Sequence, residues 1–322
     1  MAIDSSMLRM LLRTHERYKL GGDILTLGVA DVHGTHEEME QIIQQEGFPY
    51  IPVEPQNRRM SLTKRQREFS LLFGHSRFMH QGDLLSMLGF RRIESMDAFD
   101  NESPTHLHDL NMPVAKALHE QFDAVLDLGT LDHVFDMRTA IANMVNLLKV
   151  GGVVMIYDAM IGWHNQSLYN FQPPFYFDTF KAHGFSDMQL FIHYYPKYGH
   201  GRRTRTEWRE FQYNDEINFR KPFHYTACFF TARKEKRVDV DKFLQGYYIE
   251  HHADPEHSAK FQELSRQPSF INGAPEVIKR AYPFLARVFR YVPNFMRVLL
   301  IDYVIFKIAN ARKYSGRKTL RL

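Results

Sequence analysis

Cysteine is almost absent from this sequence, because its 322 residues contain only Cys228. A single cysteine excludes a disulfide framework and a cysteine-rich metal site. Cys228 stands in the apolar run 225–230, so we expect a buried thiol. The first residues show no basic segment followed by an apolar run, so no signal peptide is expected and a cytoplasmic location is predicted.

A strong charge of one sign is also lacking, since the formal net charge is only +4. The basic residues fall in short groups at 202–205, 233–237 and 312–321. A nucleic-acid-binding protein usually gathers such residues into one stripe, so no nucleic-acid partner is predicted. The 17 histidines form no His-Glu-x-x-His motif and no close pairing with carboxylates, so no metal site is expected.

Apolar and aromatic residues are plentiful, at 44% and 14% of the chain. Short apolar runs bounded by glycine or polar residues alternate with segments of helical periodicity. We expect strands at 24–29, 91–96, 105–108, 122–128, 153–157, 188–195 and 223–231. We expect helices at 1–20, 35–45, 64–89, 137–148 and 174–183, and a loop at 47–63. This alternation predicts an α/β fold with a doubly wound, mostly parallel sheet.

Polar residues and one glycine follow the first three expected strands. Gly28 follows the first strand, Asp97 the second and Asp109 the third. Ligands of open α/β sheets bind beyond the carboxyl ends of the strands, where a carboxylate can accept hydrogen bonds from ribose hydroxyls. Each residue alone also fits a tight turn or a helix cap, and it is their placement at successive strand ends that favours a nucleotide site.

The stretch Phe122-Asp-Ala-Val-Leu-Asp-Leu-Gly-Thr-Leu-Asp-His-Val134, followed by Ala140 to Gly152, resembles the fourth and fifth strands of class I S-adenosylmethionine-dependent methyltransferases. The run Leu147-Leu-Lys-Val-Gly-Gly152 is the most specific part of the resemblance. About two thirds of the chain takes part in it. The resemblance implies a methyltransferase with S-adenosylmethionine as its cofactor.

The same resemblance implies a role for several residues. Leu27, Gly28 and Val29 would pass under the methionine part of the cofactor, Asp97 would hold the ribose, and Asp109 and Leu110 would flank the adenine. Gly129, Thr130 and Asp132 would line the floor near the sulfonium. It also implies three regions: an N-terminal helix at 1–21, a Rossmann-like methyltransferase domain at 22–234 and a helical C-terminal extension at 235–322.

Catalysis would fall to Asp132 and His133, where His133 is suited to accept a proton because histidine titrates near neutrality. A helix cap or a packing role is the alternative for His133. The aromatic and polar segment 163–173 suits a small-molecule or glycan acceptor, and we expect His164, Asn165, Tyr169 and Asn170 to contact it. A loop that seals the sheet edge is the alternative for that segment.

Two departures from the family pattern leave other functions open. The first glycine-rich loop is sparse, and about 60 residues separate the first two strands. An inactive, methyltransferase-like binding protein therefore remains an alternative, as does a nicotinamide-dependent oxidoreductase, against which the missing Gly-x-Gly-x-x-Gly motif argues.

The expected C-terminal extension is apolar and basic between 277 and 321, and Pro283 and Pro293 divide it. It is expected either to pack on the domain or pair across a homodimer, or to lie at a membrane surface as a peripheral contact.

Overall fold

The computed structural model describes residues 2–55, 78–163, 166–194, 207–213, 225–238, 240 and 319–320. The chain divides into two compact units, of which the first comprises Met1–Asp215, Phe219–Asp241 and Thr319–Leu322. All the described residues belong to this first unit. Most of the predicted C-terminal extension lies outside the described residues, and its helical character stays a prediction.

A nine-stranded sheet forms the centre of the first unit. Its strands lie in the order β11 (Thr319–Leu320), β9 (Glu207–Phe211), β8 (Phe185–Tyr194), β10 (Thr226–Lys234), β7 (Leu148–Ile161), β6 (Phe122–Asp127), β2 (Gly22–Leu27), β4 (Phe90–Asp97) and β5 (His106–Leu107). The strands from β7 to β5 pair in parallel, whereas β10 is antiparallel to both of its neighbours. The predicted fold class is confirmed: the sheet is open and mostly parallel.

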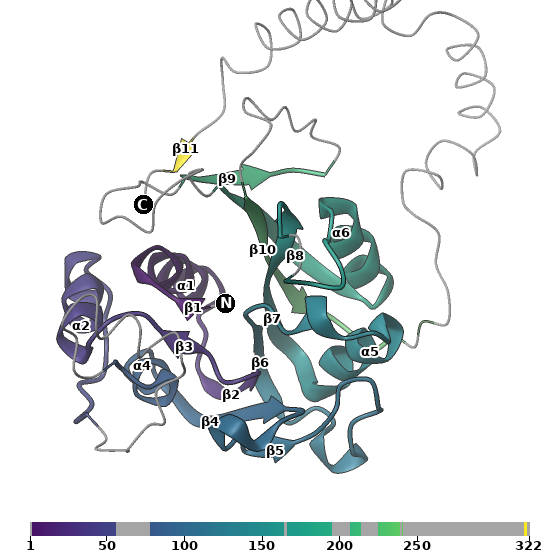
Figure 1. The fold of residues 1–322 in the computed structure, drawn as a ribbon, viewed down its shortest axis with the longest axis horizontal. Coiled ribbons are helices and arrows are strands. Elements are labelled where there is room, and N and C mark those ends of the chain that lie inside the picture. The colour runs from purple at the N-terminus through teal and green to yellow at the C-terminus, as the bar shows by residue number, and fades with distance from the viewer. Residues whose placement is uncertain are drawn as a thin grey trace, which may run out of the picture. The chain divides into compact units, whose positions relative to one another are not determined.

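Helices cover both faces of this sheet, as Figure 1 shows. One face carries α1 (Ser5–Tyr18), α2 (His36–Gln45) and α4 (Gln81–Met87), and the other carries α5 (Met137–Leu147) and α6 (Pro173–Ala182). A small parallel pair, β1 (Ala2–Ile3) with β3 (Asp31–Val32), lies outside the main sheet. The short 3-10 helices are η1 (Asp100–Glu102), η2 (Lys116–Leu118) and η3 (Leu131–His133).

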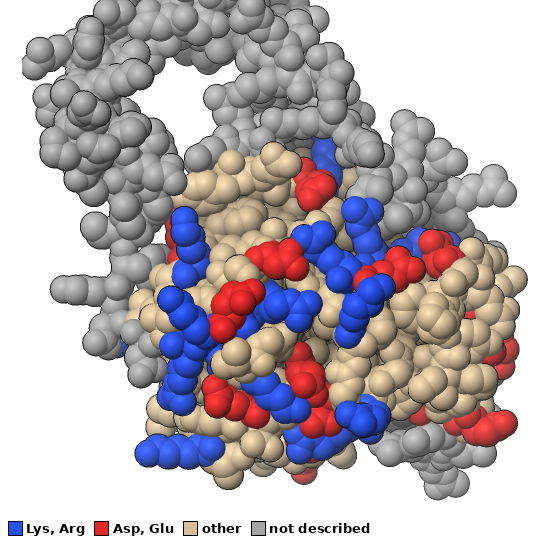
Figure 2. Space-filling view, turned by 180° about the vertical axis from the view of Figure 1, so that it is seen from behind, with Lys and Arg blue, Asp and Glu red and all other residues tan. Residues whose placement is uncertain are grey.

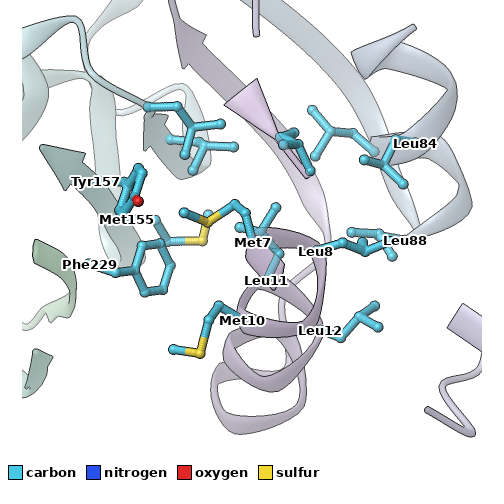
Figure 3. Packing of buried hydrophobic residues seen from close by; sticks show 14 of the residues in the cluster. Met7, Leu8, Met10, Leu11, Leu12, Leu84, Leu88, Met155, Tyr157 and Phe229 are labelled. Atoms are coloured by element: carbon cyan, nitrogen blue, oxygen red, sulfur yellow. The ribbon is translucent and has the colours of Figure 1, made fainter. Parts of the chain in front are cut away.

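The helix α1 is the centre of the core on its face of the sheet. Asp4 caps it, since the Asp4 side chain accepts hydrogen bonds from the backbone N–H groups of Ser6 and Met7 at 3.0 and 2.9 Å. The helix places its apolar side chains between two partners, as Figure 3 shows: Leu84 and Leu88 on one side, and Met155, Tyr157 and Phe229 of the sheet on the other. Burial on two sides explains why this helix is apolar over most of its circumference.

The β6–α5–β7 unit forms as predicted, but the junction between α5 and β7 lies before Gly151 and Gly152 and not after them. The helix expected at 137–148 and the strand expected at 153–157 leave Gly151 and Gly152 between two elements, whereas α5 ends at Leu147 and β7 runs from Leu148 through both glycines. Gly151 has a φ of +87°, and a Cβ on Gly152 would lie 2.9 Å from the carbonyl oxygen of Lys149. The glycines therefore serve a shift of register between β6 and β7, where the backbones approach closely.

Two further expectations need correction. The expected polar connection before the last strand contains β9, whose Trp208 and Phe211 are buried although three of its five residues are charged. Of the helix expected at 64–89, only residues 78–89 are described, and within them the helix is limited to α4; the helix over 64–77 lies outside the described residues and stays a prediction. The sequence pattern failed at β9 because a strand of five residues shows too few alternations to be recognised.

The order of the parallel strands creates a point at which the connections reverse direction. Counted along the chain, the spatial order β5-β4-β2-β6-β7 is third, second, first, fourth and fifth. The first and fourth strands, β2 and β6, are therefore neighbours whose connections leave in opposite directions. Ligands of doubly wound sheets bind in the crevice at such a switch point, beyond the carboxyl ends of the strands.

Hydrogen bonds close the long insertion between β2 and β4 at its base. Ala30 N–H donates to Oε1 of Gln81 at 2.7 Å, and Met79 N–H donates to the carbonyl oxygen of Gly34 at 2.9 Å. Gln81 Nε2 also donates to Oγ1 of Thr26 in β2 at 3.3 Å. The 60-residue separation therefore does not disturb the sheet, because β2 and α4 are joined directly across it.

Charged side chains of both signs share the surface. Figure 2 shows a face on which Lys and Arg lie interspersed with Asp and Glu. No basic stripe is visible among the described residues on this face. None of the helices in the described part of the chain is long and apolar enough to cross a membrane.

Candidate functional site

Three strand ends meet at the switch point, and each contributes one of the predicted site residues. Gly28 follows β2 with a φ of +77°, a left-handed conformation that side chains disfavour. A Cβ at Gly28 would lie 2.9 Å from Oγ1 of Thr130 and 3.8 Å from Oδ2 of Asp97. The structure therefore brings Gly28, Asp97 and Thr130 together, and only glycine leaves the space between them free.

Hydrogen bonds fix this convergence. Thr130 Oγ1 donates to the carbonyl oxygen of Leu27 at 2.8 Å, which ties the turn after β6 to the end of β2. Gly28 N–H donates to the carbonyl oxygen of Met96 at 2.7 Å, which ties the same point to β4. Asp97 is held through Oδ1, which accepts from Phe99 N–H at 2.9 Å, so that Oδ2 is directed at Gly28.

A buried carboxyl that the sequence analysis did not single out holds the turn at Gly129 and Thr130. Asp127 is fully buried at the end of β6, where its two oxygens accept from Thr130 N–H at 2.8 Å and Leu131 N–H at 3.0 Å. Burial raises the pKa of Asp127 to about 7, although both hydrogen bonds oppose the rise. Asp127 is a positioning residue for Thr130, which contacts Gly28.

The predicted catalytic pair lies on η3, directly after this turn. Asp132 is buried and its backbone carbonyl accepts from Leu168 N–H at 2.9 Å and Tyr169 N–H at 3.2 Å. Its Oδ1 has no hydrogen-bond partner among the described residues and lies 3.6 Å from Nε2 of His133. Burial raises the pKa of Asp132, and His133 partly offsets the rise. His133 is more than half exposed, so a helix-packing role does not account for it.

A second buried carboxyl lies beneath this pair, in the middle of the sheet. Asp158 of β7 is completely buried, and Tyr176 OH donates to its Oδ2 at 3.5 Å, while Oδ1 has no partner among the described residues. Burial, followed by the charges of Asp127 and Asp132, raises the pKa of Asp158 well above its usual value. A carboxylate inside the apolar run 153–160 was the signal in the sequence that could have revealed it.

Asp109 and Leu110, the predicted adenine partners, lie in a turn that local hydrogen bonds stabilise. Asp109 is exposed, and its Oδ1 accepts from the backbone and side-chain nitrogens of Asn111 at 2.9 and 2.7 Å, which lowers its pKa. Leu110 is buried. The turn is nevertheless next to the site, because His108 N–H donates to the carbonyl oxygen of Asp97 at 2.8 Å. Their contact with adenine stays a prediction.

The predicted acceptor residues are only partly described, because His164 and Asn165 lie outside the described residues. Tyr169 is half-buried, and its OH donates to the carbonyl oxygen of Phe135 at 3.0 Å. Asn170 is exposed. The loop after β7 is therefore joined to the loop after β6, on which Asp132 and His133 lie.

No group of three or more metal-binding side chains comes together in the described parts of the chain. Two histidines near the site have other partners. His106 Nε2 lies 2.7 Å from Oε2 of Glu94, and His108 Nε2 lies 3.0 Å from the carbonyl oxygen of Met112.

Comparison with known proteins finds no matching family model and no matching curated protein. Among solved structures, the chain is similar to a Burkholderia thailandensis 1,6-didemethyltoxoflavin-N1-methyltransferase, with 15% identity over 71% of this chain and 78% of the other, and a TM-score of 0.33. A Thermotoga maritima S-adenosylmethionine-dependent methyltransferase, named as a possible histamine N-methyltransferase, shows 14% identity over 72% and 97% of the two chains, also with a TM-score of 0.33. The DszA carbon methyltransferase shows 11% identity over 73% and 54%, with a TM-score of 0.37.

The identities and TM-scores of these similarities are low. The roles of individual residues depend on the geometry of this chain alone.

Proposed function

We propose that this protein is an S-adenosylmethionine-dependent methyltransferase that acts on a small-molecule or glycan acceptor. One observation carries the proposal: Gly28, Asp97 and Thr130 come from three neighbouring strand ends and meet at the switch point of the sheet. An open sheet binds nucleotides at this place. The missing side chain of Gly28 leaves room for a ligand to approach the backbone there.

The residues present fit the adenosine part of this cofactor. Asp97 directs Oδ2 toward the space that a Cβ on Gly28 would fill, and a carboxylate at this place can accept hydrogen bonds from vicinal ribose hydroxyls. Thr130 closes the other side of that space. Leu27, Val29 and Gly129 adjoin these residues in the chain and would contact the cofactor through their backbones, while Asp109 and Leu110 would contact its adenine.

Methyl transfer asks for alignment of the acceptor and for removal of a proton. The cofactor supplies the activated methyl group when it is bound. Asp132 and His133 lie on η3, which begins directly after Thr130, and we expect this pair to take up a proton of the acceptor. The raised pKa of Asp132 brings this carboxylate closer to the range in which a base is effective.

Titration calorimetry of the full chain with S-adenosylhomocysteine tests the proposal. We expect the protein to bind S-adenosylhomocysteine, and we expect Asp97→Ala to weaken this binding about tenfold to hundredfold, which corresponds to roughly 1–3 kcal/mol for lost hydrogen bonds to hydroxyls. Asp100→Ala is the matched control, because Asp100 is an exposed carboxylate only three residues away. Its affinity should equal that of the wild type.

Two results would contradict the proposal. The first is the absence of S-adenosylhomocysteine binding at millimolar concentration by a protein that is folded by circular dichroism. The second is an equal loss of affinity in the Asp97 and Asp100 variants, which would show that general charge rather than Asp97 governs the binding. Tight binding of NADH instead would favour an oxidoreductase.

A further inference from the structure

Large apolar side chains are exposed mainly at one edge of the sheet. Eight such side chains are exposed among the described residues, and six of them lie at the carboxyl ends of the parallel strands. These six, which we call the apolar rim, are Phe99, Leu107, Met112, Phe135, Leu168 and Tyr225. Phe135 is the most exposed, at 76%. Soluble proteins seldom gather exposed apolar side chains in this way unless they contact a partner or ligand.

The loops that carry the apolar rim are joined to one another by hydrogen bonds. The end of β4 binds the end of β5 through Asp97 and His108, as described above. Asp136 N–H donates to Oδ1 of Asn111 at 2.8 Å, which joins the loops that carry Met112 and Phe135.

The same linkage continues across the loops after β6 and β7. Tyr169 OH bonds to Phe135, next to Leu168, and Trp163 Nε1 donates to the carbonyl oxygen of Thr226 at 2.8 Å, next to Tyr225. The loops that carry the apolar rim are therefore linked to one another at the same edge of the sheet as the candidate site.

Carboxylates outnumber cations in these loops. The segments 97–118 and 128–138 contain six acidic residues, against Lys116 and Arg138. Like charges crowd there: the pKa of Glu102 is raised by burial and by the charges of Asp31 and Asp97. An apolar border with a negative surplus is complementary to an apolar molecule that carries a positive charge, and it repels anionic lipid.

A buried acceptor atom lies on η3, just before the loop that carries Phe135. Asp132 is 4% exposed, and its Oδ1 has no hydrogen-bond partner among the described residues. A buried carboxylate oxygen without a donor costs free energy, and an N–H donor from a ligand would remove that cost. His133 Nε2 lies 3.6 Å from this oxygen, too far for a hydrogen bond, so the oxygen can still accept one from a donor group on the ligand.

We propose that the acceptor of this site is an apolar amine: a molecule with a hydrocarbon or aromatic portion held by the apolar rim and a basic amino group directed at Asp132. The inference rests on the proposed function and narrows its acceptor from small molecules and glycans to this class. Neither a glycan nor an anionic membrane offers both features.

The reaction balances with the groups named. The ammonium form of the amine gives one proton to the Asp132 carboxylate, which frees the nitrogen lone pair. The N–C bond forms as the C–S bond of the cofactor breaks, and the electron pair of that bond stays on sulfur. The methylated nitrogen then carries the positive charge that the sulfonium carried before.

Calorimetry with matched probes tests the inference on the full chain saturated with S-adenosylhomocysteine. The probes are phenylbutylamine, phenylbutanol and phenylbutanoate, which share the apolar portion and differ in charge, together with maltotriose. We expect phenylbutylamine to bind at least tenfold more tightly than phenylbutanol and phenylbutanoate, and maltotriose to show no binding. Equal affinities of the three phenylbutyl probes, or binding of maltotriose alone, would overturn the inference.

A pair of surface variants tests the apolar rim. Phe135→Ser should weaken the binding of phenylbutylamine about tenfold, because the contact area of one aromatic ring is lost. Val150→Ser is the matched control, since Val150 is an exposed apolar residue at the opposite edge of the sheet, and it should bind as the wild type does. Identical affinities of the two variants would overturn the role of the apolar rim.

The same samples separate this inference from the proposed function. If the chain binds S-adenosylhomocysteine but binds phenylbutylamine no better than phenylbutanol, the inference is wrong and the proposed function stands. If it binds neither S-adenosylhomocysteine nor the amine, both are wrong. Release of S-adenosylhomocysteine from S-adenosylmethionine, in the presence of the amine only, would support both.

Discussion

The two edges of the sheet use charge in opposite ways. At the amino edge, cations and carboxylates neutralise one another: Lys149 Nζ lies 2.9 Å from Oδ2 of Asp123 and 3.5 Å from Oδ2 of Asp23, and Arg92 lies 3.3 Å from Asp23. At the carboxyl edge, Asp127 and Asp132 are buried with raised pKa values, and the pKa of Glu102 is raised beside other acids.

The difference shows which edge serves the fold and which serves a ligand. The amino edge satisfies even a fully buried lysine, because Lys234 Nζ donates to the carbonyl oxygens of Leu148 and Val145 at 2.6 and 3.0 Å and lies 3.4 Å from Oε1 of Glu120. Among the described residues, the carboxyl edge leaves Oδ1 of Asp132 and Oδ1 of Asp158 without a hydrogen-bond partner, and it leaves apolar side chains exposed. Groups in such a state are expected where a protein binds a substrate and not where it is only stabilised.

Acid should affect the carboxyl half of the sheet most. His193 of β8 is buried, stacks on Trp208 with 3.9 Å between ring centroids, and lies 2.6 Å from Tyr157 OH through Nδ1. Burial lowers its pKa to about 3. The unfolded chain therefore takes up this proton near pH 6.5 and the folded chain near pH 3, so stability falls as the pH falls through this window, by about 4 kcal/mol at its end.

Urea unfolding at pH 7 and pH 4.5 measures this loss. His193→Gln cannot take up the proton, so its stability should change less between the two pH values than that of the wild type. His119→Gln is the control, because the His119 side chain is not buried, and this variant should lose as much stability between the two pH values as the wild type does. An unchanged pH dependence in His193→Gln would contradict the assignment.

Loss of the buried cation should affect the amino edge next. Lys234→Met would leave the carbonyl oxygens of Leu148 and Val145 without their donor, and we expect unfolding to become easier by about 3 kcal/mol. Lys236→Met changes an exposed lysine two residues away and should cost less than about 0.5 kcal/mol.

The affinity of Lys234→Met for the cofactor product tests whether the amino edge and the carboxyl edge have separate roles. If the amino edge serves only the fold, folded Lys234→Met protein should bind S-adenosylhomocysteine as the wild type does. A large loss of affinity without a loss of stability would show that the two edges are not separate in function.

The sequence pattern predicts those elements of the fold whose apolar residues recur at the spacing of a strand or a helix. The β6–α5–β7 unit could be predicted, because its two strands are apolar runs and its helix has a regular apolar period. The placement of Gly28 and Asp97 at strand ends could be predicted for the same reason. The role of Gly151 and Gly152 could not, because glycines end a helix and permit a close approach of strands equally well.

The site residues that the sequence pattern did not reveal depend on contacts between segments far apart in the chain. Gln81 supports the loop after β2 from a distance of 51 residues in the chain, so no local spacing announces it. Asp127 acquires its raised pKa from burial and the charge of Asp132, and Asp158 acquires its raised pKa from burial and the charges of Asp127 and Asp132. Burial is a property of the assembled sheet. Acidic residues in apolar runs are therefore worth singling out in sequences of this kind.

The smallest change in stability should come from Asp158→Asn, and it tests whether Asp158 is neutral in the folded chain. Burial raises the pKa of Asp158 well above its usual value and so favours the neutral carboxyl, which the amide of Asn matches in shape and charge. We expect the free energy of unfolding at pH 7 to change by less than about 0.5 kcal/mol, whereas Asp158→Ala should lose about 2 kcal/mol through a cavity and the lost bond to Tyr176.

The charge of Asp158 can be followed through its neighbour. An ionised Asp158 in the wild type would raise the pKa of Asp127, and the neutral Asn of the variant would not. A charge on Asp158 would therefore be seen as a lower Asp127 pKa in Asp158→Asn than in the wild type. An NMR titration of the carboxyl carbons measures that pKa. If Asp158→Asn destabilises the protein as much as Asp158→Ala does, the carboxylate is ionised in the folded chain, and the carboxyl edge is balanced by charges much as the amino edge is.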